Sequence, residues 1–369
     1  MTRLIVQCDL THSNARQQSF HLHAHLDIPL DLPGQGIIAV FGRSGSGKTT
    51  LLRCLAGLER CPSGFVSVNG AVWQDTSKGI FLPVHERTVG MVSQQPCLFP
   101  HLTVRDNLDY GFKRTPLLQR RVLWDHVVEI LGIGALLDRY PHYLSTGEQQ
   151  RVSMGRAVLS NPCLLLMDEP LASLDAQRKA EILPFIKRLN REMNLPIVYV
   201  SHSIQEIVQL ADTLVLVNEG QATITGSVHE IFSRLDVFEH QGDVAGAVID
   251  TQVVAHEPEF GLTCLEFYGR RLYVPYQLSS VGDSLRVHIL SRNVSLSLTP
   301  PPGPTSILNI FEAHVVEIGA STSGKSAVDV KLDAGCLMLA TITRKSLLAL
   351  NLSPGQRVYA SIKAVSLQL

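Results

Sequence analysis

Short apolar runs bounded by polar turns dominate the first part of the chain. GIIAVF (36–41), CLLLMDEP (163–170) and IVYVSHS (197–203) are apolar, with branched side chains, and are typical of buried strands. TTLLRCLAGLER (49–60) has apolar residues at helical spacing, so a strand, a glycine-rich turn and a helix follow one another here. This arrangement predicts an α/β fold.

The pattern changes at about residue 243, where short β-rich runs begin. GAVIDTQVV, LTCLEFYG and LRVHILSRNVSLSL come first, and the proline-rich break TPPPGP, Thr299–Pro304, interrupts them. VHEIFSRLDVF, just before the change, is predicted to be the last helix of the first domain. We therefore expect one domain at 1–235 and a β-rich region at 243–369, made of two small β units joined by a linker.

The turn after the first predicted strand, GRSGSGKT (Gly42–Thr49), matches the phosphate-loop pattern G-x-x-x-x-G-K-[ST]. Backbone N–H groups of such a loop and of the following helix converge on phosphates, and glycines allow the close approach. Lys48 can reach the β- and γ-phosphates, and the Thr49 hydroxyl can ligate Mg²⁺. The expected nucleotide-binding residues here are Gly42, Arg43, Ser44, Gly45, Ser46, Gly47, Lys48, Thr49 and Thr50.

A second stretch, GASTSGKS (Gly319–Ser326), matches the same pattern. Val328, Val330 and Leu332 then alternate with polar residues, so the chain leaves these glycines as a strand and not as a helix. A strand-turn-strand unit offers no helix N-terminus to a phosphate. We therefore predict a hairpin here and only one nucleotide site.

Two further strand ends supply partners for the first loop. CLLLMDEP ends in two carboxylates: Asp168 is expected to hold Mg²⁺ through water, and Glu169 to polarise the attacking water. His202, which follows the strand IVYVS, is expected to hydrogen-bond the γ-phosphate. These three residues complete a candidate site for phosphoryl transfer.

The segment YLSTGEQQRVSMGRA (143–157) resembles the LSGGQ signature of ABC ATPases. VGMVSQQPCLFPHLTV (89–104) resembles their Q-loop, with Gln94 at the glutamine position, and the motif order is complete from residue 3 to about 230. Ser145 and Glu148 form an S-x-x-E pattern, which predicts a capping box at a helix start and leaves N–H groups free to face an anion. The resemblance implies a P-loop ABC ATPase domain with a helical subdomain.

The same resemblance implies a homodimer that binds two ATP molecules between the phosphate loop of one subunit and the signature of the other. Ser145, Thr146 and Gly147 would contact the nucleotide, and Asp175 in LASLD would couple the two sites. Gln94 would belong to both the catalytic and the magnesium-binding residues. The sequence departs from the family at Thr146, usually glycine, which bears on site geometry and turnover.

The helical region from about Thr103 to Ser160 is where importers of this family receive a membrane subunit. The resemblance thus implies two transmembrane permease subunits, a periplasmic oxyanion-binding protein indirectly, and a peripheral position on the cytoplasmic face of the bacterial inner membrane. The N-terminus lacks the apolar core of a signal peptide, and no run approaches the roughly 20 apolar residues of a membrane span. With 32 basic and 33 acidic residues, we expect no nucleic acid partner.

The last segment, about 304–369, resembles the Mop or TOBE module, an OB-like β-barrel that binds molybdate or tungstate in some relatives. The run Thr305–Asn309 and the final strand SIKAVSL carry this resemblance, and Lys325 or Lys363 could add positive charge. A purely structural barrel is the alternative. The chain as a whole resembles the ATP-hydrolysing subunit of a molybdate importer; a sibling importer ATPase for sulfate, iron or another small solute, or a soluble ABC protein, are the alternatives.

Three further features concern single residue types. Phe20 lies near the position where the family stacks an aromatic ring on adenine; the alternative is that it is the first inward residue of the strand FHLHAHLDI. His21, His23 and His25 share the other face of that strand, where a solvated face is favoured over a metal site.

The seven cysteines are odd in number and scattered, so we expect neither a disulfide framework nor a zinc site, as in a reducing cytoplasm.

Overall fold

The computed structural model describes residues 2–13, 19–30, 36–117, 120–237, 244–319, 326–364 and 367. The chain forms two compact units, Met1–Gly226 and Ser227–Leu369, and each has its own hydrophobic core.

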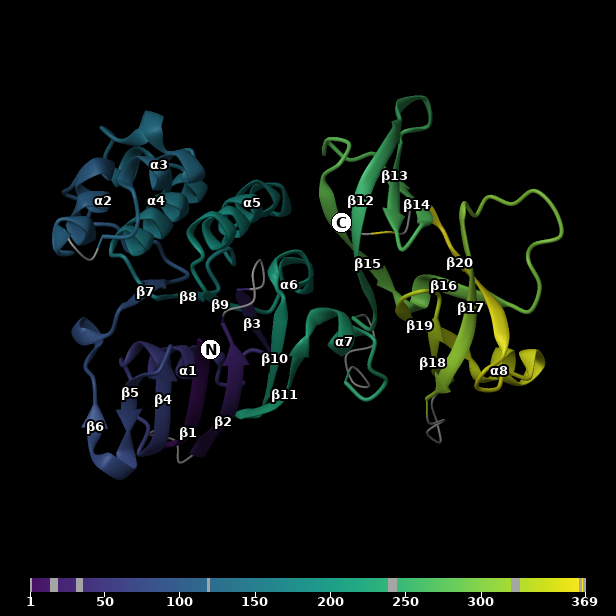
Figure 1. Ribbon diagram of the computed structural model, residues 1–369, viewed down its shortest axis with the longest axis horizontal. Coiled ribbons are helices and arrows are strands. Elements are labelled where there is room, and N and C mark those ends of the chain that lie inside the picture. The colour runs from purple at the N-terminus through teal and green to yellow at the C-terminus, as the bar shows by residue number, and fades with distance from the viewer. Residues whose placement is uncertain are drawn as a thin grey trace. The chain divides into compact units, whose positions relative to one another are not determined.

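The first unit is built on an eleven-stranded sheet with the order β6-β5-β4-β1-β2-β11-β10-β3-β9-β8-β7 (Figure 1). Its strands are β1 (Arg3–Ser13), β2 (Ser19–Pro29), β3 (Ile37–Phe41), β4 (Ser63–Val68), β5 (Ala71–Asp75), β6 (Ile80–Phe81), β7 (Val89–Val92), β8 (Leu164–Asp168), β9 (Ile197–Ser201), β10 (Thr213–Asn218) and β11 (Gln221–Ser227). Its helices are α1 (Lys48–Ala56), α2 (Val104–Phe112), α3 (Trp124–Leu131), α4 (Thr146–Leu159), α5 (Ala176–Met193) and α6 (Ile204–Leu210).

The strands that carry the candidate site lie next to one another. β3 pairs in parallel with β9, and β9 with β8, so that Phe41 lies opposite Ser201 and Asp168 opposite Val200. All five residues of β3 and of β9 are buried, as expected for parallel strands covered on both faces. The predicted strands are confirmed, and their carboxyl ends meet at one edge of the sheet.

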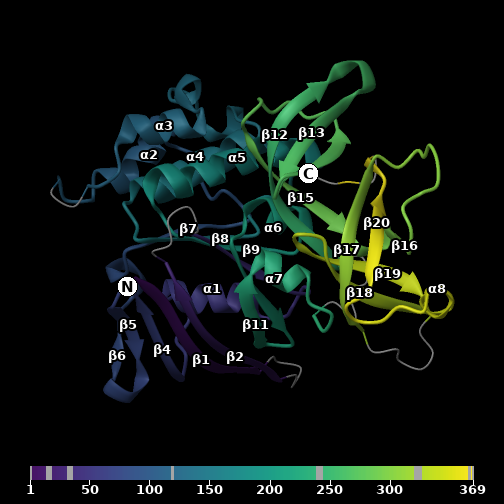
Figure 2. The ribbon, with the colours of Figure 1, turned by 45° about the vertical axis from the view of Figure 1, so that its right-hand side comes forward.

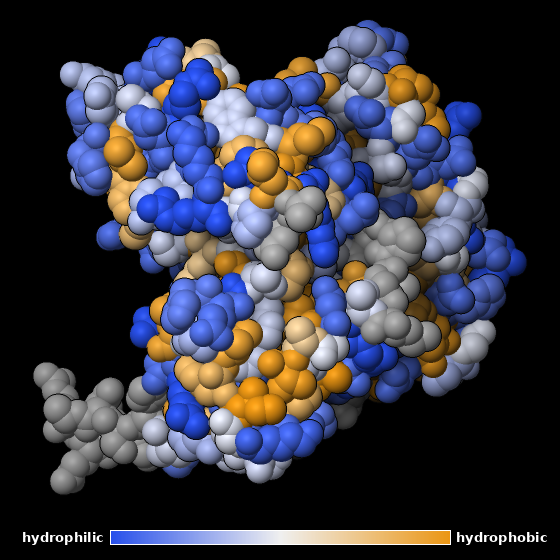
Figure 3. Space-filling view, turned by 60° about the vertical axis from the view of Figure 1, so that its left-hand side comes forward, coloured by the Kyte–Doolittle hydropathy of each residue, from blue (hydrophilic) through white to orange (hydrophobic). Residues whose placement is uncertain are grey.

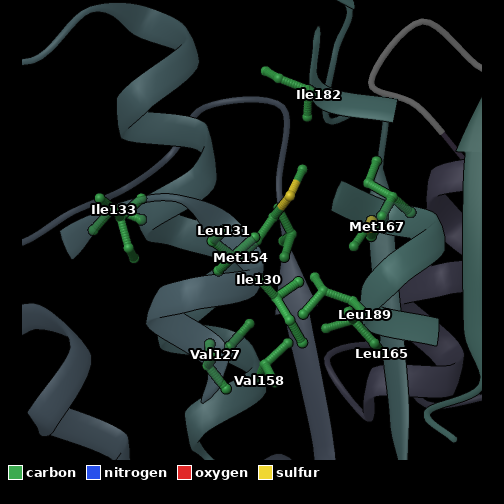
Figure 4. Packing of buried hydrophobic residues seen from close by; sticks show 14 of the residues in the cluster. Val127, Ile130, Leu131, Ile133, Met154, Val158, Leu165, Met167, Ile182 and Leu189 are labelled. Atoms are coloured by element: carbon green, nitrogen blue, oxygen red, sulfur yellow. The ribbon is translucent and has the colours of Figure 1, made fainter. Parts of the chain in front are cut away.

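The helices α2, α3 and α4 form the predicted helical region, beside the end of the sheet that carries β7 and β8 (Figure 1). Figure 4 shows side chains from α3, α4, β8 and α5 meeting in one buried cluster. The labelled residues are Val127, Ile130, Leu131, Ile133, Met154, Val158, Leu165, Met167, Ile182 and Leu189. This packing fixes α4 relative to β8, the strand that ends in Asp168.

The other end of the sheet is antiparallel, and it corrects our expectation for the cysteines. Cys8 and Cys61 form a disulfide, although 53 positions separate them in the sequence. β1 pairs with β4 so that Cys8 lies opposite Gly64, which brings the turn that contains Cys61 against β1. Cys54 of α1 lies close by, with its Sγ 3.7 Å from that of Cys8.

The side chains of β2 alternate between an exposed and a buried face, as predicted. Leu22, Ala24, Leu26 and Ile28 are buried, whereas His21, His23 and His25 are exposed. The histidines contact residues of the neighbouring strand β1: His21 lies 2.9 Å from the Thr11 hydroxyl, and His23 forms an ion pair with Asp9. The solvated strand face is confirmed.

The second unit contains a four-stranded sheet, β14-β13-β12-β15, and a five-stranded sheet, β16-β20-β17-β18-β19. Its elements are α7 (Val228–Phe232), β12 (Gly246–Glu257), β13 (Leu262–Phe267), β14 (Arg270–Pro275), β15 (Ser284–Leu290), β16 (Val294–Ser297), β17 (Asn309–Ile318), β18 (Ala327–Asp333), β19 (Leu337–Thr343), α8 (Arg344–Leu350) and β20 (Arg357–Ile362). Figure 2 shows β17 to β20 side by side, with α8 at one end.

The two sheets share one hydrophobic core. β16 precedes the proline-rich break, yet it pairs with β20 near the C-terminus, with Val294 opposite Ile362. Residues from both sheets, such as Val287 and Val358, belong to one buried cluster. α7, which we expected to close the first domain, packs on β12 in this unit, where the His229 ring donates a hydrogen bond from Nδ1 to the Val248 carbonyl (2.8 Å).

The second phosphate-loop match joins two antiparallel strands. β17 ends at Ile318, β18 begins at Ala327, and Ile318 lies opposite Val330. Val328, Val330 and Leu332 are buried, as their alternation predicted. The two predicted strands and their antiparallel pairing are confirmed. Residues 320–325, including Lys325, lie outside the described part of the chain.

In the described part of the chain, no helix is both long and apolar enough to cross a membrane. Figure 3 shows apolar residues in several groups among hydrophilic ones on one face of the molecule, and the most extended group lies in the lower part of the view.

Candidate functional site

The phosphate loop connects the end of β3 to α1, and two of its glycines are required by close contacts. A Cβ on Gly42 would lie 2.0 Å from the Val217 carbonyl oxygen. Gly47 caps α1 with φ 101°, and a Cβ there would lie 2.6 Å from the Phe20 ring. Only glycine allows the chain to turn here and to begin a helix whose first N–H groups face the loop.

Lys48, the first residue of α1, folds back over the loop. Its Nζ donates hydrogen bonds to the carbonyls of Gly42 and Arg43, both at 2.8 Å. The residue is only 5% exposed, and this burial lowers the pKa of Lys48, while Glu169 and Asp168 oppose the shift. The ammonium group is thus held inside the loop and in the field of two carboxylates.

Thr49 and Asp168 provide adjacent oxygen atoms, because the Thr49 hydroxyl donates to Asp168 Oδ1 at 3.1 Å. Burial raises the pKa of Asp168, and the hydrogen bond from Thr49 opposes the rise. Within the described residues, the buried Ser46 hydroxyl has no hydrogen-bond partner. A hydroxyl and a carboxylate suit Mg²⁺, and an orphaned loop hydroxyl suits a phosphate, so these residues fit a magnesium-bound nucleotide.

Glu169 directly follows β8 and has a left-handed backbone conformation, with φ 45°. Its N–H donates to the Val200 carbonyl at 3.0 Å, which ties the turn to β9. Its Oε2 lies 3.2 Å from His202 Nδ1. The two residues that we expected to act on water and on the γ-phosphate are therefore in contact.

Gln94 lies two residues beyond β7 and is exposed. The preceding residue is held by the signature helix, because Gln150 Nε2 on α4 donates to the Ser93 carbonyl at 3.3 Å. Sequence reasoning did not single out Gln150. The bond connects the Q-loop to the helix that begins at the signature.

The predicted capping box at the signature is present. The Ser145 hydroxyl accepts from the Glu148 N–H at 3.3 Å, and the Glu148 carboxylate accepts from the Ser145 N–H at 2.7 Å. This backbone hydrogen bond, with the Ser145 hydroxyl, lowers the pKa of Glu148. Thr146 is exposed as the first residue of α4. Asp175 caps α5 in a similar way, accepting from the Arg178 N–H at 2.9 Å.

The signature does not join the phosphate loop within one chain. Instead, Ser145 and Gly147 line a cavity of about 380 Å³ near α4 and α5, together with Arg151, Arg178 and Phe185. Among the residues that the structure describes, no hydrogen bond or ion pair connects them to the loop. Arg43, Ser44 and Gly45 of the loop are exposed, and Thr50 is half-buried.

Phe20 is a partly buried residue beside the loop. It packs against the buried cluster of the first unit, and its ring borders Gly47 and Gly220. It lies in β2 on the same face as Leu22, so the inward alternative agrees with the structure.

The candidate anion-binding residues of the tail have mixed positions. Asn309 is buried and clamps β14 to β17: its amide donates to the Tyr273 carbonyl at 2.9 Å, and its Oδ1 accepts from the Tyr273 N–H at 2.7 Å. The Thr305 hydroxyl accepts from the Ile307 N–H at 3.2 Å. Lys363 is exposed. Asn309 thus has a structural role.

Glu206 is a second residue that sequence reasoning missed. It is 3% exposed on α6, four residues after His202, and its carboxylate contacts Lys179, Tyr199 and Ser201. These partners come from two other elements. A glutamate in a predicted helix is ordinarily exposed, and nothing in a single sequence indicates that Glu206 is buried among these three partners.

The chain matches the family described as ABC transporter over residues 26–172, and the TOBE domain over residues 305–369. It is 49% identical over 342 residues to the molybdenum import ATP-binding protein ModC of Albidiferax ferrireducens, covering 93% of this chain and 92% of that relative. It is 48% identical over 343 residues to the protein of the same name from Aromatoleum aromaticum, covering 93% and 90%. The solved structure of cbiO1 from Clostridium perfringens, part of the ABC transporter complex cbiONQ, has a similar fold, with a TM-score of 0.52 at 24% identity over 64% of this chain and 92% of that chain.

Proposed function

Because the chain belongs to the molybdenum import ATP-binding proteins of the ABC transporter family, we propose that it binds and hydrolyses ATP to energise a molybdate importer. One observation carries this proposal: a phosphate-loop lysine, two magnesium-type ligands and a carboxylate in contact with a histidine meet at one edge of the parallel sheet. These residues are Lys48, Thr49, Asp168, Glu169 and His202.

Each residue has a defined task in hydrolysis. The loop N–H groups and Lys48 would bind the phosphates, and Thr49 and Asp168 would hold Mg²⁺, which would neutralise charge on the phosphates. Glu169 orients and polarises the attacking water, and His202, 3.2 Å from Glu169, hydrogen-bonds the γ-phosphate. Removal of the general base costs about 10²- to 10⁴-fold in rate in such sites.

A complete site also requires the signature, which lies apart from the phosphate loop of its own chain. We propose a homodimer in which the exposed Ser145 and Thr146, with Gly147, face the nucleotide of the partner subunit. The N–H groups at the start of α4 then point at an anion. Asp175, exposed at the start of α5, lies at the same interface.

The helical region 103–160 is proposed to receive the membrane partners, two permease subunits that are served by a periplasmic oxyanion-binding protein. The hydrogen bond from Gln150 to Ser93, next to Gln94, supports this role, because it joins the signature helix to the Q-loop. The chain would then be a peripheral protein on the cytoplasmic face of the inner membrane.

Reconstitution tests the transport function. The chain is combined with its candidate permease in vesicles, with the binding protein added outside, and uptake of molybdate is compared with uptake of sulfate. We expect ATP-dependent molybdate uptake that is absent with the Lys48→Ala chain. Uptake of sulfate in place of molybdate would contradict the proposed substrate, and uptake without ATP hydrolysis would contradict the proposed mechanism.

A further inference from the structure

The side chain of Glu206 is the centre of a buried hydrogen-bond network behind the candidate site. Its Oε2 accepts hydrogen bonds from the Tyr199 and Ser201 hydroxyls, both at 2.7 Å. Its Oε1 pairs with Lys179 Nζ at 2.8 Å. Burial raises the pKa of Tyr199 well above its usual value, and the nearby Glu206 raises it further, so the phenol stays a donor.

This network holds both residues that flank His202. Ser201 precedes it, and the hydroxyl that donates to Glu206 also accepts from the Ser203 N–H at 3.0 Å. Ser203 follows it, and its hydroxyl accepts from the Glu206 N–H at 3.5 Å as the cap of α6. His202 itself is about half exposed and points to Glu169. The backbone that carries His202 is therefore clamped on both sides by one residue.

The same carboxylate reaches the helix that begins at Asp175. Lys179 lies one turn into α5, and its N–H donates to the Asp175 carbonyl at 3.0 Å. The side chain of Lys179 is 22% exposed and that of Glu206 is 4% exposed, so solvent screens this ion pair only weakly. One ion pair, with a buried carboxylate and a partly buried lysine, thus joins the segment of His202 to the segment of Asp175.

We propose that Glu206 is a positioning residue for ATP hydrolysis, which acts by fixing His202 against Glu169 and by linking this histidine to α5. The inference rests on the proposed function, since it assigns to the same site a residue that does not contact the nucleotide but holds His202 in place. A buried ion pair that served only the fold would affect stability alone. A positioning role affects turnover through His202.

Glu206→Gln tests this proposal in the full-length chain, because it keeps the shape but removes the charge that faces Lys179. We measure steady-state MgATP hydrolysis, equilibrium binding of a fluorescent ATP analogue, and the thermal unfolding temperature. We expect kcat to fall about 10- to 100-fold, with ATP affinity changed less than about twofold, as for loss of orientation without loss of binding. The matched control is Glu192→Gln, an exposed carboxylate of α5 that is paired with Arg188 at 2.7 Å, and it should leave kcat unchanged.

A double variant separates positioning from a general structural effect. If Glu206 acts through His202, Glu206→Gln should cost nothing further in a His202→Ala chain, because the group that it positions is gone. Equal losses in both backgrounds would overturn the proposal. Should Glu206→Gln fail to fold, Ser201→Ala breaks the same link with a smaller change, and wild-type turnover in that variant would overturn the proposal.

The wild-type chain distinguishes this inference from the proposed function. If it does not hydrolyse MgATP, both are wrong. If it does, and Glu206→Gln is equally active, only this inference is wrong.

Discussion

Glu169 combines two properties that a single sequence shows only in part. Its place after an apolar strand predicts a carboxylate at the sheet edge, whereas its left-handed backbone and its contact with His202 depend on the fold. The carboxylate is thus held at the end of β8 by main-chain geometry and by a hydrogen bond to β9. This explains why Asp168 and Glu169, neighbours in sequence, serve different groups.

Glu169→Gln should retain ATP binding and lose most hydrolysis. The amide keeps the size of the side chain but cannot accept a proton from water, so we expect turnover to fall about 10²-fold or more. Binding of a fluorescent ATP analogue and release of phosphate provide the two measurements. Turnover at the wild-type rate would remove Glu169 as the base.

Lys48→Ala should abolish hydrolysis, because the lysine amine is the buried cation of the loop. Lys325→Ala is the matched control: it changes the equivalent lysine of the second pattern match, which joins two strands and precedes no helix. ATP binding and turnover, measured side by side, should be intact in this control. Equal losses in the two variants would contradict a single nucleotide site.

At the scale of elements, the strand β1 and the turn before β4 are covalently joined, which the spacing of cysteines did not predict. Sequence spacing gives no measure of distance across a sheet, and Cys8 and Cys61 meet only because β1 pairs with β4. The runs GIIAVF, CLLLMDEP and IVYVSHS were predictable, since burial on both faces leaves a continuous apolar signal. Their order in the sheet was not.

Reduction of the Cys8–Cys61 disulfide should destabilise the first unit. Closing a loop with a sequence separation of 53 restricts the unfolded chain, which corresponds to about 4 kcal/mol in the chain-entropy treatment. Chemical denaturation with and without reductant measures the difference. Cys97→Ser, at an exposed free cysteine, should leave it unchanged, and a chain insensitive to reductant would contradict a structural disulfide.

Burial raises the pKa of the neighbouring Cys54 to about 12, so its thiol stays protonated near neutral pH and does not compete for the disulfide.

The junction of α7 with β12 should weaken at alkaline pH. The hydrogen bond that the His229 ring donates to the Asp250 carboxylate raises the pKa of His229 above its usual 6.5. This stabilisation is complete below pH 6.5 and is lost as the pH rises through the higher folded value. The ring of His288 meets that of Phe232 of α7 edge to face, and burial lowers the pKa of His288 to about 4. Its effect on stability is therefore opposite, a loss that appears as the pH falls from 6.5 to 4.

Hydrogen exchange of the β12 amides across pH 6 to 9, corrected for intrinsic rates, measures the effect of His229. We expect protection to fall with rising pH in the wild-type chain and to be independent of pH in His229→Gln. Protection that is constant in the wild type would contradict the assigned ion pair with Asp250, which also accepts from Arg286 Nε at 2.7 Å.

On the scale of the whole molecule, the sequence predicted an ATPase and a β-rich tail, but not where the tail begins. VHEIFSRLDVF resembles the end of the first domain because it follows an α/β pattern. Its helix belongs to the second unit through contacts such as those of His229 with Val248 and Asp250. Local periodicity predicts an element and carries no information about which core it joins.

The tail is expected to bind a tetrahedral oxyanion. Calorimetry on the full-length chain should give heat of binding for molybdate or tungstate and none for sulfate. The full chain is used because β16, at residues before the module, completes its sheet. The absence of molybdate heat would support a purely structural tail.

Because β16 pairs with β20, the segment that folds as one sheet is longer than the segment that is recognised by its sequence. The recognisable module spans 305–369, yet a fragment cut there would leave the edge of β20 bare of Val294–Ser297, and unpaired edges invite aggregation. A recombination event that moved only the recognisable module to another ATPase would therefore transfer this sheet without its edge strand β16. A segment that keeps this sheet whole has to start upstream of the proline-rich break and include β16, as the compact unit Ser227–Leu369 does.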